Sequence, residues 1–273
     1  MGRVTQRRRA LVVRADGSAT PRRETLAGEE PLEIRVNGRP LAVTMRTPGD
    51  DFDLVAGNLV SEGFVGRADE LAVMRYCGGA VVDGTNTYNV IEASVLGLDP
   101  ASIAERRVVT TSACGVCGTT SIDEVRRQSR FGAHEPEPRI PVPVLLSLPD
   151  RLRAEQELFD STGGLHAAGL FDAAGELRCV REDVGRHNAV DKVVGWALRD
   201  DRLPLRGTVL QVSGRASFEL VQKCHLAGIP VLAAVSAPSS LAADLAEEVG
   251  ITLVGFSRGD RATVYTHPER VEA

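Results

Sequence analysis

The last third of the chain alternates short apolar runs with helical segments, and this alternation constrains the fold more than any other feature of the sequence. The order is strand, helix, strand, helix, strand, over residues 208–215, 216–228, 229–237, 238–250 and 251–258. Apolar runs joined by helices are typical of parallel strands with right-handed crossovers. Gly228 and Gly250 follow the two helical segments, at the position where glycine commonly ends a helix. The sequence therefore predicts an α/β sheet containing three buried parallel strands.

Small and polar residues follow each of these three strands. They form the segments SGRAS from Ser213, SAPSS from Ser236 and FSRGDR from Phe256, which contribute Arg215, Arg258 and Arg261. In open α/β sheets, ligands bind where the carboxyl ends of strands meet helix amino-termini, and such helix ends favour anions. This edge is predicted to bind a nucleotide or another phosphate-bearing ligand. The alternative is a set of ordinary polar loops, since none matches a glycine-rich phosphate fingerprint.

The rest of the chain is divided by its patterning. Alternating residues surround Asn37-Gly38, a pair typical of a tight hairpin turn, and a helical segment and two more strand-like runs follow. Residues 134–144 hold four prolines and are predicted to form a linker or surface loop. We predict three parts, a basic, flexible N-terminal tail (1–24), a small α+β domain (25–107) and an α/β domain (108–273).

Composition and charge argue against several classes of protein, including nucleic-acid-binding, membrane-spanning and secreted proteins. The chain has 273 residues, 43% hydrophobic and 25% charged, which is ordinary for a globular protein with a proper core. A formal net charge of −5 argues against nucleic acid as a partner. No apolar run approaches the length of a membrane span, and the basic first ten residues lack the apolar stretch of a secretory signal. The five cysteines are an odd number and, except for one pair, are widely scattered, so we expect a cytoplasmic protein without a disulfide framework.

One cysteine pair stands apart, Cys114-Gly115-Val116-Cys117. A structural zinc site needs four ligands, and here there is no second pair and no nearby histidine, so no metal site is expected. Zinc-dependent nucleobase deaminases need an upstream H-x-E, and no histidine precedes Cys114. The predicted helix start at Ser121 is too distant for a thioredoxin-type pair. Spacing alone favours redox or sulfur chemistry, with a metal ligand pair or two inert thiols as alternatives.

Two histidines are candidates for a supporting role. His187 precedes Asp191 by one helical turn, and a carboxylate there would orient the imidazole for proton transfer. The alternative is that Asp183, Arg186 and Asp191 form a surface charge network at a helix start. His166 follows a glycine-rich turn and, taken alone, is more typical of a structural residue.

Five long motifs carry a family resemblance. In chain order they are TTSACGVCG, GGLHAAGLF, REDVGRHNAVDKVVG, SGRASFELVQK and GFSRGDRATVYTHPER. They resemble the FdhD family of formate dehydrogenase accessory sulfurtransferases, from about residue 30 to the end. Some relatives carry a further cysteine where this chain has Gly164, so a third relay thiol is not expected at that position.

The resemblance implies a sulfur carrier with a cytidine-deaminase-like, three-layer α/β/α C-terminal domain and a smaller N-terminal α+β unit. Such a carrier takes persulfide sulfur from a cysteine desulfurase. It passes the sulfur to the molybdenum or tungsten bis-guanine-dinucleotide cofactor, Mo-bis(molybdopterin guanine dinucleotide), before that cofactor enters formate dehydrogenase. Cys114 would carry the persulfide and Cys117 would assist its release. Family members form homodimers.

The resemblance also assigns the cofactor-binding stretch, in which a guanine nucleotide could bind. That stretch comprises Phe256, Ser257, Arg258, Gly259, Asp260 and Arg261. The stretch coincides with the third strand end predicted above, and Ser213 and Arg215 of the first strand end join the predicted site. The competing hypothesis is a non-catalytic chaperone that escorts the cofactor and uses its cysteine pair for a structural metal or for dimer formation.

Overall fold

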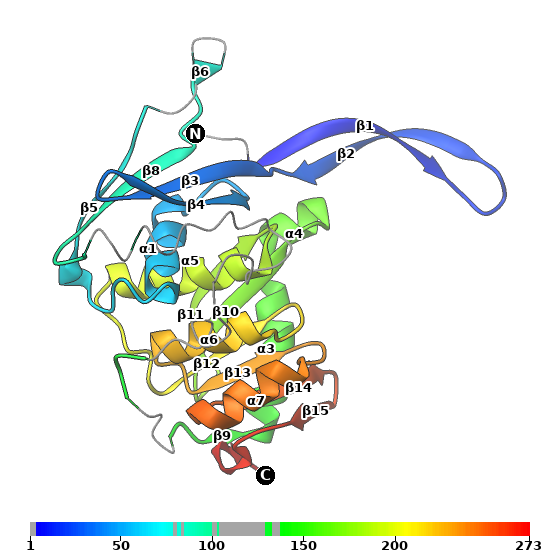
Figure 1. Ribbon diagram of the computed structural model, residues 1–273. Helices are drawn as coiled ribbons and strands as arrows, with labels where there is room; N and C mark the ends of the chain where they lie inside the picture. The colour runs from blue at the N-terminus through cyan, green and yellow to red at the C-terminus, as the bar shows by residue number, and fades with distance from the viewer. Residues whose placement is uncertain (1–3, 79–80, 83–84, 100–102, 104–128, 133–136) are drawn as a thin grey trace.

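The computed structural model describes residues 4–78, 81–82, 85–99, 103, 129–132 and 137–273, and shows a mixed α/β protein (Figure 1). Its largest sheet has six strands in the order β11-β10-β12-β13-β14-β15. The strands are β10 (His166–Asp172), β11 (Leu177–Asp183), β12 (Thr208–Val212), β13 (Val231–Ala234), β14 (Thr252–Arg258) and β15 (Arg261–Val264). β12, β13 and β14 pair in parallel, as the alternating pattern predicts, and antiparallel strands flank them on both sides.

Helices cover both faces of this sheet. α3 (Val142–Ala154) lies on one face, where Leu145, Leu148 and Leu152 pack in an apolar cluster with alternate residues of the strands. α5 (Arg186–Arg199), α6 (Phe218–Ala227) and α7 (Ser240–Val249) contribute to the cluster on the other face. Gly228 and Gly250 have φ of 71° and 77° and end α6 and α7, as predicted. The three-layer arrangement expected for this part is confirmed.

The N-terminal third forms a four-stranded sheet in the order β4-β3-β8-β5. Its elements are β3 (Glu30–Val36), β4 (Arg39–Arg46), α1 (Asp51–Ser61), β5 (Leu71–Tyr76) and β8 (Val90–Val95). Asn37 and Gly38 have φ of 48° and 77°, so the predicted tight turn between β3 and β4 is confirmed. α1 lies between this sheet and α5 (Figure 1).

α1 and α5 touch through their backbones. A Cβ atom at Gly57 of α1 would overlap the carbonyl group of Asp191, and a Cβ at Gly195 of α5 would overlap that of Asp53. Only glycine allows two helices to approach this closely. The apolar cluster therefore runs without interruption from the small sheet through α1 and α5 to the six-stranded sheet.

The N-terminal segment predicted as a flexible tail is largely paired. β1 (Thr5–Val13) and β2 (Ala19–Ala27) form an antiparallel hairpin that extends away from the body as an arm (Figure 1). The predicted boundary at residue 24 falls inside β2, and the one at residue 107 lies outside the described residues. The turn contains Asp16-Gly17, a hairpin signal that the sequence offers and that the prediction of a tail overlooked.

The middle of the chain holds the remaining elements. The proline-rich segment is a loop only in part, because β9 (Ile140–Pro141) and the start of α3 lie inside it. Proline is tolerated there because the first helical turn has no need of its N–H group. The predicted helix start at Ser121 lies outside the described residues. The shorter elements are η1 (Ala68–Glu70), β6 (Val81–Val82), β7 (Thr85–Asn86), α4 (Glu157–Thr162), η3 (Pro268–Arg270) and β16 (Val271–Glu272).

Candidate functional site

The three polar segments predicted to meet at one sheet edge do meet there. Because β12, β13 and β14 are parallel and adjacent, their carboxyl ends lie side by side. Backbone hydrogen bonds join the loops, from the Ser239 nitrogen to the Ala216 oxygen (3.1 Å) and from the Phe256 nitrogen to the Ser236 oxygen (3.3 Å). α6 and α7 begin directly after two of these loops, so their positive amino-termini face the same edge.

Three arginines lie on these loops, and all three are exposed. Arg258 and Arg261 stand opposite each other across the turn between β14 and β15, where Gly259 has φ of 62°. Like charges directly opposite on a strand pair repel each other unless an anion lies between them. Within the described part of the chain, neither these two nor Arg215 forms an ion pair. The edge therefore offers three guanidinium groups for a phosphate-bearing ligand.

The end of β14 is locally irregular. The strand shifts register between Gly255 and Arg258, and Phe256 has φ of 51°, a left-handed conformation that a bulky residue rarely adopts. Ser257 is fully buried, and its hydroxyl has no hydrogen-bond partner among the described residues. Strained backbone and unsatisfied polar atoms cluster at binding sites. These features are unusual for a hairpin turn and are typical of a ligand-binding segment, which here is the FSRGDR stretch.

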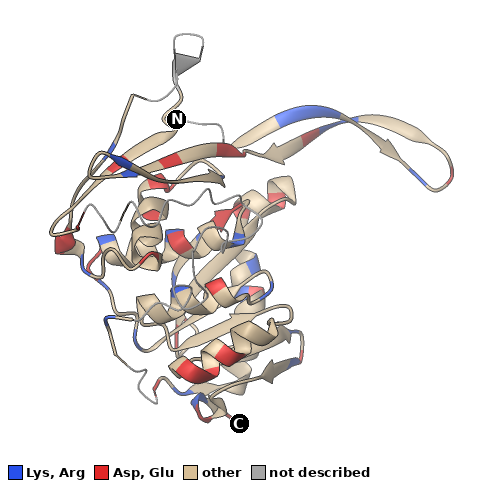
Figure 2. Cartoon of the chain, in the orientation of Figure 1, with Lys and Arg blue, Asp and Glu red and all other residues tan. Residues whose placement is uncertain are grey.

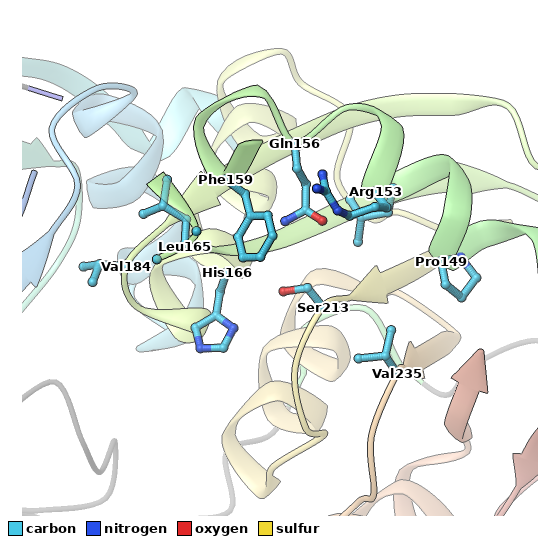
Figure 3. A pocket seen from close by; sticks show the side chains of 12 residues that line it. Pro149, Arg153, Gln156, Phe159, Leu165, His166, Val184, Ser213 and Val235 are labelled. Atoms are coloured by element: carbon cyan, nitrogen blue, oxygen red, sulfur yellow. The ribbon is translucent and has the colours of Figure 1, made fainter. Parts of the chain in front are cut away.

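A cavity of about 460 Å³ opens beside the same edge, on the α3 side of the sheet (Figure 3). Ser213, Val235 and His166 line its strand side, and Gln156 and Phe159 line its helical side. Its size lies in the range of small-molecule sites. An aromatic ring, an imidazole, an amide and a hydroxyl around one space suit a flat heterocycle with a hydrogen-bonding edge.

Local contacts hold the lining residues in place. The Ser213 hydroxyl accepts a hydrogen bond from the Ala167 nitrogen (2.9 Å), which fixes the start of β10 against the end of β12. The Glu182 carboxylate accepts bonds from the backbone nitrogens of Leu158 (2.9 Å) and Phe159 (2.8 Å), which ties α4 to β11. The Phe159 ring in turn lies 4.8 Å from the Arg153 guanidinium carbon.

The two candidate histidines lie close to this edge but differ in environment. Burial, followed by the charges of Arg186 and His187, lowers the pKa of His166 below its ordinary value of 6.5. Its ring is therefore neutral at pH 7. His187 Nε2 lies 3.3 Å from the Ser217 hydroxyl and 3.8 Å from the Glu219 carboxylate at the start of α6. The neighbouring His187 ring is the main reason why the pKa of Glu219 falls from 4.5 to about 2.

Glu219 is therefore the partner of His187, and the predicted partner Asp191 is wrong. Asp191 instead accepts hydrogen bonds from Ser61 (2.6 Å) and Lys223 (2.7 Å). Helical spacing correctly places Asp191 one turn from His187, but that face of α5 packs against α1 and α6. Glu219 lies 32 residues from His187, and its acidic position in the first turn of α6 was the only signal in the sequence.

The alternative surface charge network is also wrong. Asp183 is fully buried and Asp191 is 3% exposed. Asp183 forms an ion pair with buried Lys192 (2.8 Å) and accepts a hydrogen bond from the Thr47 nitrogen (3.1 Å). Both carboxylates therefore join the N-terminal part to α5 and α6 from the inside.

The predicted catalytic pair, Cys114 and Cys117, lies outside the described residues. Of the other cysteines, Cys179 and Cys224 are buried and Cys77 is half-buried. Burial raises the pKa of Cys179 to about 12 and that of Cys224 further still. Both buried thiols are therefore unreactive near pH 7, as expected for small core residues.

The described residues contain no group of three or more histidine, cysteine, aspartate or glutamate side chains placed to hold a metal ion. Nor do they contain a helix with the length and apolar character of a membrane span.

Comparison with known proteins gives consistent matches. A sulfur carrier protein FdhD from Streptomyces avermitilis is 60% identical over 274 residues, covering 99% of this chain and 97% of the relative. A protein of the same name from Mycobacterium tuberculosis is 53% identical, covering 99% of this chain and all of the relative. The solved structure of a proposed formate dehydrogenase accessory protein from Desulfotalea psychrophila superposes with a TM-score of 0.77 at 26% identity, covering 99% of this chain and 100% of the other.

The family model described as the FdhD/NarQ family matches residues 27–272. This range includes the small sheet, α5 and all three strand-end loops. The chain belongs to the FdhD/NarQ family.

Proposed function

We propose that this protein is a sulfur carrier that serves formate dehydrogenase. Relatives at 53% and 60% identity over nearly the whole chain bear the name sulfur carrier protein FdhD, which supports this role. The observation that carries the proposal is the strand edge with three arginines free of ion pairs within the described residues, beside a cavity of about 460 Å³. Such an edge suits a phosphate-bearing acceptor of the sulfur.

The cysteine pair would carry the sulfur. A cysteine desulfurase transfers a sulfane sulfur to the Cys114 thiolate and forms a persulfide there. The Cys117 thiolate then attacks the Cys114 sulfur, the bond to the outer sulfur breaks, and hydrosulfide leaves for the acceptor metal. The resulting Cys114–Cys117 disulfide returns to two thiols through a cellular dithiol reductant.

The acceptor is a substrate of the carrier, the molybdenum or tungsten bis-guanine-dinucleotide cofactor. Its phosphates would lie against Arg215, Arg258 and Arg261, where the amino-termini of α6 and α7 add a favourable dipole. One of its flat heterocycles would lie in the cavity beside Phe159 and His166. A homodimer, as the family resemblance implies, would present two such edges for the two nucleotides.

Sulfur loading is the first test. The protein is incubated with a cysteine desulfurase and cysteine, and its mass is measured before and after reduction. We expect the mass of one sulfur atom on the peptide that contains Cys114, and no gain in a Cys114→Ala variant. Equal loading of that variant would refute the assigned role. A Cys114→Ser protein that binds guanine nucleotide but leaves formate dehydrogenase inactive supports a carrier, whereas an active dehydrogenase supports an escort.

Nucleotide binding is the second test. Arg258→Ala and Arg261→Ala should each weaken binding of guanosine diphosphate about tenfold, since a charge-assisted hydrogen bond contributes about 1.5 kcal/mol. Arg178→Ala is the matched control. Arg178 is an exposed arginine of β11 near the opposite edge of the sheet, where it pairs with Asp172. Equal affinities for all three variants would place the nucleotide elsewhere.

A further inference from the structure

Gln156 is a buried polar residue whose side chain lacks a partner among the described residues. It lies between α3 and α4 and is 4% exposed. Its backbone nitrogen donates to the Arg153 oxygen (3.4 Å) and its backbone oxygen accepts from the Asp160 nitrogen (3.0 Å), but its side-chain amide forms no hydrogen bond within the described part of the chain. A buried polar group normally has a partner, because its desolvation otherwise costs free energy. A ligand would supply the partner that this amide lacks.

The Gln156 amide faces the cavity of about 460 Å³ beside the strand edge. Figure 3 shows the end of this side chain directed into the space, with the Phe159 ring beside it and Ser213 on the opposite wall. The described residues that line the cavity include no carboxylate. Among them, Gln156 alone presents a hydrogen-bond donor and an acceptor side by side in one plane.

A donor beside an acceptor is complementary to a lactam, in which a ring N–H adjoins a ring C=O. The amide nitrogen would donate to the ring oxygen, and the amide oxygen would accept from the ring N–H. The Phe159 ring, held 4.8 Å from the Arg153 guanidinium carbon, can stack on a flat heterocycle. Guanine and pterin both contain a lactam edge. We propose that Gln156 is the specificity-determining residue of the cavity and binds this edge of a guanine or pterin ring, an inference that rests on the proposed function.

The position of the cavity suits a ligand whose phosphates lie against the arginines. Ser213 lines the cavity, and Arg215 follows it by two residues in the same loop. β14, which ends at Arg258, is two strands away from β12 in the sheet, on the order of 10 Å at the usual strand spacing. A nucleoside diphosphate spans such a distance, so its ring could bind Gln156 while its phosphates contact the guanidinium groups.

Specific contacts are needed because the overall charge of the chain does not favour an anion. The net charge is −5, and Figure 2 shows carboxylates along α7, whose amino-terminus adjoins this edge. Attraction to the protein as a whole therefore contributes little to nucleotide binding. A site that forms a hydrogen bond with a ring N–H rejects an analogue without it, because the polar group of the site is then left without a partner.

Isothermal titration calorimetry of the full chain with nucleotide analogues tests the contact. If the ring is guanine, inosine diphosphate should bind within about threefold of guanosine diphosphate, because it lacks only the 2-amino group and keeps the lactam edge. N1-methylguanosine diphosphate carries a methyl group in place of the ring N–H and should bind about tenfold more weakly. In Gln156→Leu, guanosine diphosphate should bind about tenfold more weakly than to wild type, and its advantage over the N1-methyl analogue should disappear.

Two control variants separate this contact from other effects. Glu155→Leu places the same side chain on the neighbouring, exposed residue and should keep the preference for guanosine diphosphate over the N1-methyl analogue. Arg258→Ala should weaken both nucleotides equally and keep the same preference, so it tests the proposed function independently of Gln156. The melting temperature of Gln156→Leu should not fall, because the amide has no hydrogen bond within the described residues to lose. A fall of several degrees would give the amide a structural role and overturn the proposal.

6-Hydroxymethylpterin distinguishes the two ring sources. If the cavity binds pterin, Gln156→Leu should bind this compound about tenfold more weakly than wild type, with the affinity for guanosine diphosphate equal in both proteins. If Gln156→Leu changes neither affinity, Gln156 does not bind the ring and the proposal is wrong. That result would leave the arginine contacts and sulfur loading of Cys114 to be judged by their own tests.

Discussion

Loss of the buried charge of Lys192 should strongly destabilise the protein. Lys192 is 1% exposed, and its ammonium group pairs with Asp183 at 2.8 Å and donates to the carbonyl oxygen of Thr47 at 3.0 Å. Replacement by methionine keeps the length of the side chain but removes the charge. The Asp183 carboxylate would keep its bonds from the backbone nitrogens of Thr47 and Gly185, yet it would lack a counter-charge in a fully buried position.

The buried environment of Lys192 indicates how much free energy of unfolding the variant should lose. Removal of one partner of a buried ion pair costs about 3–5 kcal/mol. This is a large part of the roughly 5–15 kcal/mol that holds a folded protein together. For a protein of this size, each kcal/mol lowers the melting temperature by about 2–4 °C, so Lys192→Met should melt about 10 °C lower. Urea unfolding followed by circular dichroism gives the free energy directly.

Two further variants test whether the buried ion pair is the cause of the lost stability. Arg178→Met removes an exposed ion pair with Asp172 and should cost under about 1 kcal/mol. Asp183→Asn combined with Lys192→Met should be more stable than Lys192→Met alone, because no charge is then left buried without a partner. If Lys192→Met unfolds within about 1 kcal/mol of wild type, the ion pair does not stabilise the join between the N-terminal part and α5.

Three other outcomes follow from the structure. The pKa of Glu219 is lowered from 4.5 to about 2. Its carboxylate therefore stabilises the fold above pH 4.5, and this contribution is lost as the pH falls towards 2. Glu219→Gln should flatten this part of the curve of unfolding free energy against pH. Gly195→Ala should lower the free energy of unfolding in urea by about 2 kcal/mol or more, because the added Cβ overlaps a carbonyl of α1. A Cβ at Gly78 meets no atom within 4 Å, so Gly78→Ala should change the free energy of unfolding by less than about 0.5 kcal/mol. Iodoacetamide at pH 7 should leave Cys179 and Cys224 unmodified in the folded protein, as read by mass spectrometry.

Local signals in the sequence predicted much of the fold. Asn37-Gly38 fixed a hairpin because two residues decide the turn, and Gly228 and Gly250 ended helices by their own conformation. The order of strands and helices then placed three polar loops at one edge, because parallel strands share an end. Each of these predictions depends on residues that are close in sequence or on a general rule of handedness.

The wrong predictions concern side chains whose partners are distant in sequence. Helical spacing gave Asp191 to His187, whereas the true partners are Glu219 for His187 and Lys223 for Asp191, each 32 residues further along. No periodicity within one helix can report such a pairing. The sequence predicts a tail where the structure has the arm, because β1 is charged and mostly exposed and lacks the usual alternation of apolar and polar residues. The cavity could not be foreseen either, since α3 and α4 reach it from outside the predicted loops.

The glycine contact between α1 and α5 limits how the polypeptide could be cut. A fragment starting at residue 108 would keep α5 but lose α1 and the small sheet, and Val190, Val193 and Val194, all fully buried, would lose part of their cover. Each buried aliphatic side chain contributes about 1.5–3 kcal/mol, so such a fragment would be insoluble or would bind the missing piece from solution. Co-produced halves should therefore reassemble through that helix pair, which makes the protein suited to split-fragment complementation.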